Sequence, residues 1–264
     1  SNQQIDWKRY DSDGSIWFEE TILISDIVKP IHTEVDSVKN TLITILKEAF
    51  LLNPDFLINS EGYKITTELT FPRNWGLGTS STLINNISQW LKIDAFVLLK
   101  NSFGGSGYDI ACAQNDAPIL YHLERGNPIV EKVDFLPSFT TNIHFVYLNK
   151  KQNSKTAIAA YKRNNKNNLS KVITSNNQTT SEVLEAKTIQ AFAEALEKHE
   201  LDMSAILETP TIKDSLFPDF RGAVKSLGAW GGDFVMVIAK ENPTEYFAQK
   251  GYTTIIPYDE MILT

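Results

Sequence analysis

Residues 71–83, FPRNWGLGTSSTL, place two glycines and four consecutive hydroxyl residues between two segments of different pattern. Residues 63–71, which end where this stretch begins, alternate polar and apolar side chains and predict a half-buried strand. Residues 81–93 repeat apolar side chains at helical spacing and predict a helix. A plain turn needs one or two special residues, so the richer joint between strand and helix indicates a bound ligand.

The chemistry of such a joint favours phosphate. Backbone N–H groups at a helix start are unpaired and carry a partial positive charge, and small residues let an anion come close. The hydroxyls could cap the helix, bind phosphate oxygens or ligate Mg²⁺. The alternative is a tight turn with a hydroxyl cap; the Walker A and GxGxxG patterns are absent. The predicted phosphate-binding residues are Gly76, Leu77, Gly78, Thr79, Ser80 and Ser81.

Two further glycine clusters follow. In residues 103–114, FGGSGYDIACAQ, Asp109 comes directly after a glycine turn and enters a run of small residues. A lone carboxylate in such surroundings is a candidate general base, and a helix-capping aspartate is the alternative. Residues 225–237, KSLGAWGGDFVMV, lead into an apolar strand, either as a ligand-wrapping loop or as a turn with a bulge.

Composition excludes several classes of function. The formal net charge is −7 and the pI about 5.2, so we expect no nucleic-acid partner. A single cysteine and four scattered histidines make a disulfide framework or a zinc site improbable. No apolar run reaches membrane-spanning length and no signal peptide opens the chain, so we expect no membrane partner and a cytoplasmic location.

Charge is uneven along the chain. Residues 150–171 hold seven Lys or Arg and no acid. This stretch is either a solvated face or a basic rim for an anionic substrate. Binding loops often follow strand ends, so the strand predicted over 142–150 singles out Lys150, Lys151 and Lys155 as candidate substrate contacts.

Hydrophobic patterning predicts further elements. A hairpin is expected over 5–9 and 16–25, and a helix at 93–103 with Asp94 as N-cap. Another helix is expected over 180–199, where Thr179-x-x-Glu182 resembles a capping box. The remaining predictions are strands at 117–123, 129–134 and 252–258, and helices at 33–52, 154–162 and 243–250. Without strict βαβ alternation the order favours an α+β fold, with domains over 1–145 and 146–264.

In this order the three glycine clusters resemble the motifs of the GHMP kinases, the family of galactokinase, homoserine kinase, mevalonate kinase and phosphomevalonate kinase. PRNWGLGTSS resembles the phosphate-binding motif Pro-x-x-x-Gly-Leu-Gly-Ser-Ser, with Thr79 as a conservative replacement. GSGYDIACA resembles the Gly-Ser-Gly-Phe-Asp-Val segment of phosphomevalonate kinases, and GAWGGDFVMV a Gly-Ala-Gly-Gly-Gly-Asp motif. The string GYDIA is also similar to a bacterial subgroup named after it.

The resemblance implies a two-domain GHMP kinase fold, with a ribosomal S5 domain 2-like N-terminal domain that binds ATP and a ferredoxin-like C-terminal domain. The loop 76–81 would wrap the triphosphate in the cleft, with Ser80 near Mg²⁺. Asp109 would match the catalytic aspartate, which takes the proton of the acceptor hydroxyl or orients it. The loop 228–232 would close over the substrate. The implied substrate-binding residues are Ser106, Gly107, Gly228, Ala229, Gly231 and Gly232.

Three departures from the family pattern bear on activity. The first family motif, a Gly-Lys…Gly-Glu-Tyr/His stretch, is absent, and we expect an N-terminal segment to be missing from this sequence. The region before Asp109 has no counterpart of the glutamate that holds Mg²⁺ in mevalonate kinase. Trp230 stands where glycine is commoner.

The leading hypothesis is therefore an ATP-dependent small-molecule kinase of the mevalonate pathway of isoprenoid biosynthesis. Phosphomevalonate is favoured over mevalonate as acceptor, because the second and third motifs resemble those of phosphomevalonate kinases and the basic stretch suits a substrate that already carries phosphate. Two alternatives stay open: a diphosphomevalonate decarboxylase, and a non-catalytic GHMP-fold protein that binds a ligand. The expected cofactors are ATP and Mg²⁺, and the sequence leaves a homodimer open.

Overall fold

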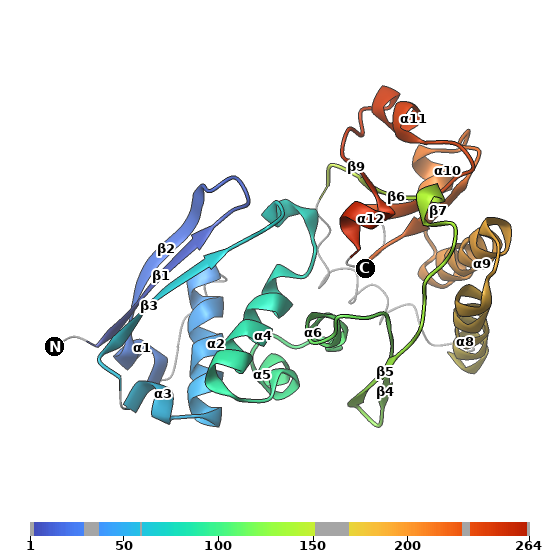
Figure 1. Cartoon of the computed structure of the whole chain (residues 1–264). Helices are drawn as coiled ribbons and strands as arrows, with labels where there is room; N and C mark the ends of the chain where they lie inside the picture. Colours follow the sequence, from blue (N-terminus) through green and yellow to red (C-terminus); the bar gives the residue numbers. More distant parts are fainter. Residues whose placement is uncertain (1–2, 29–36, 59, 151–168, 229–232, 263–264) are drawn as a thin grey trace. The chain divides into compact units, whose positions relative to one another are not determined.

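The computed structural model describes residues 3–28, 37–58, 60–150, 169–228 and 233–262. The chain divides into two compact units (Figure 1), the first formed by 1–73 and 77–134, the second by 74–76 and 135–264. The sequence placed the boundary at 145/146, which falls inside one strand, β6 (Ile143–Tyr147). All five residues of β6 are buried, because this strand belongs wholly to the sheet of the second unit.

A three-stranded sheet of order β2-β1-β3 opens the first unit. β1 (Gln4–Tyr10) and β2 (Ile16–Leu23) form an antiparallel hairpin, which confirms the hairpin predicted from the sequence. β3 (Gly62–Glu68) adds to the other side of β1 in parallel. The register between β1 and β2 shifts after Arg9, because Tyr10 pairs with Ile16 while Arg9 pairs with Phe18. Such a bulge changes the direction of side chains at the end of a hairpin.

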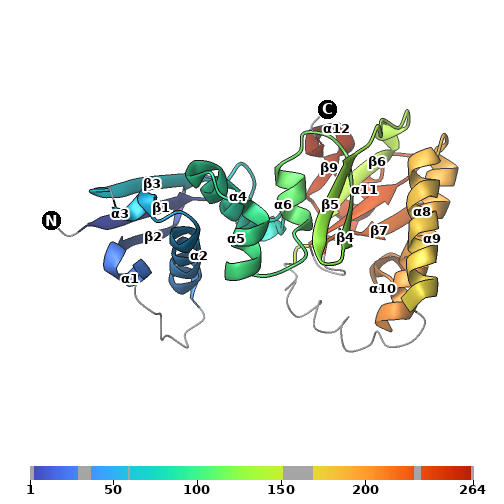
Figure 2. The ribbon, with the colours of Figure 1, turned by 90° about the horizontal axis from the view of Figure 1, so that it is seen from below.

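Helices cover one face of this sheet (Figure 2). The long helix α2 (Val38–Leu52) buries its apolar face in a core shared with Ile5, Trp7 and Ile22 of the sheet. The sequence predicted a helix over 33–52; α2 begins at Val38, where Ser37 caps it, and residues 33–36 lie outside the described part. The other helical elements are α1 (Ile24–Val28), α3 (Asp55–Ile58), η1 (Arg73–Trp75), α4 (Thr79–Leu91), α5 (Ala95–Ser102) and α6 (Tyr108–Ala113).

The predicted cap of α5 is confirmed in atomic detail. The Asp94 carboxylate accepts hydrogen bonds from the backbone N–H groups of Phe96 and Val97, at 2.7 and 3.1 Å. These bonds satisfy donors that have no partner inside the helix. After α6 a second hairpin completes the unit, with β4 (Ile119–Glu124) antiparallel to β5 (Asn127–Lys132), again near the predicted positions.

The second unit contains a four-stranded antiparallel sheet of order β7-β8-β6-β9. Its inner strands are β6, predicted as a central strand, and β8 (Phe234–Ile238), predicted as a buried strand. The outer strands are β7 (Ala223–Ser226) and β9 (Ile255–Pro257). The remaining helical elements are η2 (Thr140–Asn142), α8 (Leu169–Glu185), α9 (Ile189–Leu207), α10 (Ile212–Leu216), α11 (Thr244–Gln249) and α12 (Tyr258–Met261).

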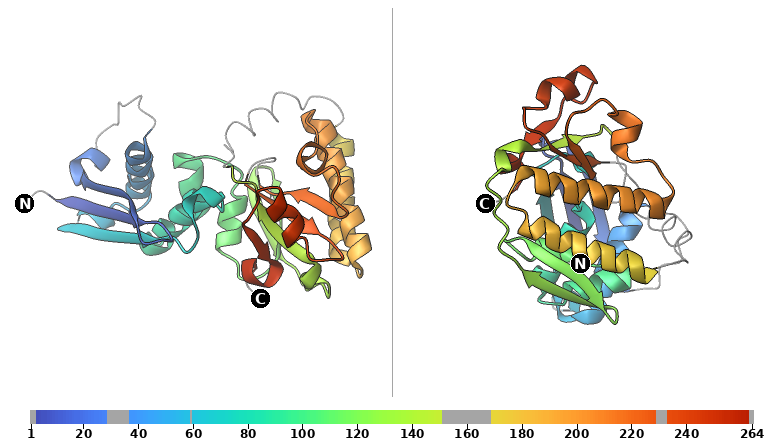
Figure 3. Two further views of the ribbon diagram at one scale, coloured as in Figure 1. Left: turned by 90° about the horizontal axis from the view of Figure 1, so that it is seen from above. Right: turned by 90° about the vertical axis from the view of Figure 1, so that its right-hand side faces the viewer.

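Helices α8 and α9 lie side by side in this unit (Figure 3). The point at which α8 ends and α9 begins corrects one prediction. The capping box expected at Thr179-x-x-Glu182 is wrong, because α8 continues through these residues and ends at Glu185. Thr179 is buried, and its hydroxyl accepts a hydrogen bond from Lys198 Nζ at 3.2 Å. The true cap is Thr188, which accepts from Ala191 N at 3.2 Å. A Thr-x-x-Glu spacing also occurs inside helices, so the motif alone does not place a helix start.

The predicted α+β class is thereby confirmed. The first unit is mainly helical and holds a small mixed sheet, and the second unit holds an antiparallel sheet packed with helices. The helix predicted over 154–162 lies outside the described residues. Within the described residues, no helix is long and apolar enough to cross a lipid bilayer.

Candidate functional site

Helix α4 begins where the sequence predicted a phosphate-binding loop. Its N-cap residue is Gly78, in the left-handed conformation with φ of 72°, and no side chain caps the helix start. A glycine suits this backbone conformation because other residues are strained there. The first N–H groups of this long helix are thus left for another acceptor, and a helix N-terminus favours an anion.

The three hydroxyl residues of the loop face different surroundings. Ser80 is exposed at the first turn, while Thr79 is half-buried. Ser81 is buried, with 9% of its surface exposed. The sequence treated the three as one group of phosphate contacts, but a helical turn sends successive side chains in directions about 100° apart. Of these three residues, only Ser80 is exposed.

Ser81 instead meets the predicted catalytic carboxylate. Asp109 lies in the first turn of α6, after the N-cap residue Gly107, and the Ser81 hydroxyl hydrogen-bonds its side chain. Burial raises the pKa of Asp109 above its usual value, and the hydrogen bond from Ser81 lowers it in part. A Cβ at Gly78 would lie 3.7 Å from the Asp109 carboxylate. The structure therefore brings the start of α4 and Asp109 together.

A second polar contact holds the two helices in this register. Asn85 lies one turn after Ser81 on α4, and its amide oxygen accepts a hydrogen bond from Gln114 Nε2 at 3.2 Å. The Asn85 Nδ2 group donates to the carbonyl of Ala113 at 3.5 Å. Residues four apart share one face of a helix, so α4 presents a polar edge to α6. This edge fixes where Asp109 stands relative to the helix start.

The glycine loop before Asp109 is held by an aromatic side chain that sequence reasoning missed. Gly104, Gly105 and Gly107 all have positive φ. The hydroxyl of Tyr121, on β4, donates a hydrogen bond to the carbonyl of Ser106. A Cβ at Gly107 would lie 3.1 Å from that hydroxyl and 2.9 Å from the ring of Phe96. No local pattern marks Tyr121, because it meets the loop from fifteen residues away.

The first loop glycine, Gly76, has a carboxylate against it inside the second unit. A Cβ at Gly76 would lie 2.2 Å from Cγ of Asp233, so the close approach requires glycine. Asp233 immediately precedes β8, and its carbonyl accepts a hydrogen bond from Leu148 N at 2.8 Å. Trp75, which precedes Gly76 in the chain, packs on Phe234, which follows Asp233, with ring centroids 5.4 Å apart. Asp233, a residue of the third glycine cluster that the sequence did not single out, thus lies against the first glycine of the first cluster.

The rest of the third cluster is described in part. Gly228 follows β7 with φ of 61° and is exposed. β7 itself carries a buried ion pair: Lys225 Nζ lies 3.1 Å from a carboxylate oxygen of Glu200 on α9. The other oxygen of Glu200 accepts from Ser226 N at 3.0 Å. The predicted contacts Ala229, Gly231 and Gly232 lie outside the described residues.

Of the three lysines predicted as substrate contacts, one is described. Lys150 is exposed and lies three residues after the end of β6. Lys151 and Lys155 lie outside the described residues.

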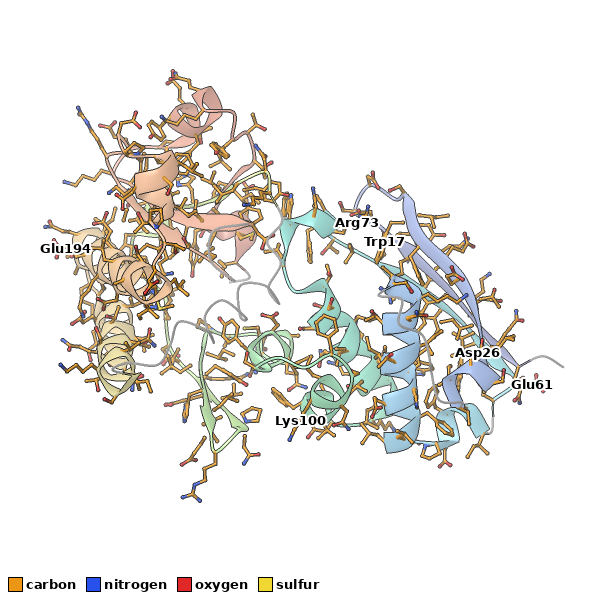
Figure 4. The ribbon with its side chains drawn as sticks, turned by 180° about the vertical axis from the view of Figure 1, so that it is seen from behind. Trp17, Asp26, Glu61, Arg73, Lys100 and Glu194 are labelled. Atoms are coloured by element: carbon orange, nitrogen blue, oxygen red, sulfur yellow. The ribbon has the colours of Figure 1, made fainter. Side chains whose placement is uncertain are left out.

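A stack of cations on aromatic rings lies at the end of the first hairpin and was not predicted. The guanidinium carbon of Arg9 lies 5.3 Å from the ring centre of Trp17, and that of Arg73 lies 5.4 Å from the same ring. Figure 4 shows Trp17 beside Arg73. Arg73 also pairs with Asp11, at 3.4 Å, and burial lowers the pKa of Arg9 to about 10. Residues 9 and 17 meet because the hairpin bulges between them.

The described residues offer a metal ion isolated side chains and no cluster of ligands. No cluster of three or more His, Cys, Asp or Glu side chains able to hold a metal ion occurs among them. A hard cation such as Mg²⁺ needs no such cluster when phosphate oxygens and water supply most of its ligands. The exposed hydroxyl of Ser80 suits that role, because Mg²⁺ prefers oxygen ligands.

Comparison with known proteins identifies the fold. No protein-family model and no curated protein matches the sequence. Among solved structures, Streptococcus pneumoniae phosphomevalonate kinase in complex with phosphomevalonate and AMPPNP is similar, with a TM-score of 0.66 and 17% identity over 97% of this chain and 88% of that one. Methanococcus jannaschii mevalonate kinase is similar with a TM-score of 0.62 and 16% identity, over 95% and 82% of the two chains.

The L. major mevalonate kinase in complex with R-mevalonate is also similar, with a TM-score of 0.56 and 14% identity over 97% of this chain and 81% of that one. The chain thus has the fold of the GHMP kinases, as its motifs predicted. At these identities the likeness establishes the fold, and the chemistry must be argued from the residues.

Proposed function

We propose that this protein is an ATP-dependent kinase that phosphorylates a small molecule, an acceptor of the mevalonate pathway. The observation that carries the proposal is the contact between the start of α4 and Asp109. A helix start without a side-chain cap, next to a carboxylate with a raised pKa, provides an anion site beside a proton acceptor. Phosphoryl transfer to a hydroxyl uses both, and transfer to a phosphate uses the anion site together with accurate positioning of the acceptor.

Each group has a role in this proposal. The backbone N–H groups of Gly78, Thr79 and Ser80 bind phosphate oxygens of ATP. Ser80 supplies a hydroxyl ligand to Mg²⁺, which, when bound, neutralises charge on the phosphates. Asp109 faces the acceptor and orients its nucleophilic oxygen. Its raised pKa moves the carboxyl towards the range in which a general base works best near neutral pH.

The reaction is balanced as follows. An acceptor oxygen forms a bond to the γ-phosphorus of ATP, while the bond from that phosphorus to the bridging oxygen breaks and ADP leaves. With a hydroxyl acceptor, the hydroxyl proton passes to the carboxylate of Asp109. With a phosphate acceptor, the attacking oxygen is already ionised, and Asp109 acts by orientation alone.

Phosphomevalonate is the proposed acceptor, on the strength of the second and third motifs and of the basic stretch 150–171. A phosphorylated substrate would be recognised by lysine charges, of which Lys150 is exposed at a strand end. Replacing Lys150 and Lys151 together by alanine should raise KM for phosphomevalonate about tenfold and leave KM for ATP within about twofold. An unchanged KM for phosphomevalonate would remove the basic rim from the proposal.

The deciding experiment measures ADP formation by the 264-residue chain with ATP and Mg²⁺, offered phosphomevalonate or mevalonate in parallel, with Asp109→Asn as control. Transfer to phosphomevalonate that Asp109→Asn abolishes is the expected result. Transfer to mevalonate alone would keep the kinase and change its substrate. Release of CO₂ would identify a diphosphomevalonate decarboxylase. Absence of ATP binding by titration would make a non-catalytic ligand-binding protein the better description.

A further inference from the structure

The loop that leads to Asp109 has little stiffness of its own. Its residues 104–107 are three glycines and one serine, and all three glycines have positive φ. Glycine has the largest conformational freedom in the unfolded chain, so such a loop is ordered only by contacts from outside it. Asp109 is two residues past its end, and any movement of the loop moves this carboxylate.

The outside contacts converge on Tyr121 of the hairpin β4–β5, which follows α6 in the chain (Figure 1). Its hydroxyl donates to the carbonyl of Ser106, and its ring lies edge-on to Tyr108, with centroids 5.7 Å apart. Gly107 is buried between Tyr121 and Phe96, so tightly that a methyl group would collide. One side chain therefore contacts the residues on both sides of the N-cap of α6.

The hydrogen-bond ladder of α6 depends on the same point. The first bond of the helix runs from Ala111 N to the carbonyl of Gly107, at 3.0 Å. If Gly107 shifts, this bond breaks and the first turn, which carries Asp109, frays. Since α6 is only six residues long, it has little further structure to resist fraying.

We propose that Tyr121 is a positioning residue that fixes the glycine loop and, through it, the carboxylate of Asp109 against the acceptor. It acts through its hydrogen bond to Ser106 and its ring contact with Tyr108, and touches neither ATP nor the phosphates. This inference rests on the proposed kinase function. It deepens that function by proposing that a hairpin outside the three motifs holds the residues that face the acceptor.

The test removes one oxygen atom. Tyr121→Phe keeps the ring and deletes the hydrogen bond to Ser106. We expect kcat/KM for the acceptor to fall about tenfold while KM for ATP changes less than about twofold, because only the acceptor side is displaced. The matched control is Tyr63→Phe, which deletes an equivalent bond, from Tyr63 to the carbonyl of Phe56 in the same unit, away from the loop. Tyr63→Phe should leave both parameters at their wild-type values.

A second readout does not require activity. Amide hydrogen exchange at Ala111 should quicken about threefold or more in Tyr121→Phe, while the corresponding first-turn amide of α5, Leu98, which bonds to Asp94 at 3.0 Å, should be unaffected. Exchange and kinetics that both match the wild type would overturn the inference. Equal losses of ATP and acceptor affinity would also overturn it, since they indicate general destabilisation. Faster exchange at Ala111 in a chain without any phosphoryl transfer would establish the anchor and refute the kinase proposal.

Discussion

Ser81 on α4 hydrogen-bonds the carboxylate of Asp109 on α6, and this contact links the predicted phosphate loop to the predicted catalytic residue. The two serines of the loop therefore differ in what they can contact. Ser80 is exposed at the helix start, whereas Ser81 is buried against the neighbouring helix. A serine in this position gives the carboxylate a partner that stabilises its charged form.

Ser81→Ala should raise the pKa of Asp109, because the hydrogen bond that it removes holds that pKa down. If Asp109 accepts a proton, the acid limb of the kcat profile should move to higher pH, while the Kd for ATP should change less than about twofold. The carboxyl carbon shift of Asp109, followed by NMR titration, gives the pKa without turnover.

Ser88→Ala is the control for Ser81→Ala. Ser88 is buried on the same helix, and among the described residues its hydroxyl has no hydrogen-bond partner, so its loss should leave the pKa of Asp109 and the kinetics unchanged. A weakening of ATP binding in Ser81→Ala alone would show that Ser81 contacts phosphate and not Asp109.

Asp109→Asn should lower phosphoryl transfer by at least about 10²-fold and at the same time stabilise the fold near neutral pH. Burial raises the folded-state pKa of Asp109 above 3.8, so the folded chain binds this proton more tightly than the unfolded chain does. The ionised carboxylate therefore costs stability above the folded pKa, and the cost fades as pH falls through that pKa. The gain in Tm should shrink as the pH falls through the folded-state pKa towards 3.8; a gain that is constant with pH would contradict this explanation.

Gly76→Ala should destabilise the protein more than Gly14→Ala. Both glycines have positive φ, at 71° and 78°, so both substitutions carry the strain of a left-handed residue, about 1–2 kcal/mol. Nothing lies within 4 Å of a Cβ at Gly14, whereas one at Gly76 overlaps Asp233 and should add about 1–3 kcal/mol. Urea denaturation of both variants, each also combined with Asp233→Ala, measures the difference. If Asp233→Ala does not relieve the extra loss at Gly76, the contact is not its cause.

Lys225→Met should lower the free energy of unfolding by about 3–5 kcal/mol, because it leaves the buried carboxylate of Glu200 without its cation. The double variant Lys225→Met with Glu200→Leu should recover most of this loss, since well-packed apolar groups often replace a buried ion pair at little cost. The residual loss should reflect the bond from Ser226 N to Glu200, which the double variant also removes. Chemical denaturation of the four combinations gives the coupling; single-variant losses that simply add would show that the pair is not coupled.

Most of the fold could be read from local patterns. The hairpin of β1 and β2, the Asp94 cap and the buried strands β6 and β8 follow from alternation, capping chemistry and apolar runs, which act over a few residues. The capping box at Thr179 failed for the same reason: its spacing is local, while the packing of α8 against α9 that keeps the helix continuous is not.

The sequence by itself determined the three glycine clusters, the position of Asp109 after the second of them, and the α+β class of the chain, because these depend on residue types and short spacings. Tertiary structure alone decided which side chains contact the motif residues. Ser81 turns towards Asp109 because α4 packs on α6, Tyr121 reaches Ser106 because a hairpin folds back on the loop, and Asp233 meets Gly76 from 157 residues away. Such contacts join distant positions through packing, and no local pattern in the sequence encodes them.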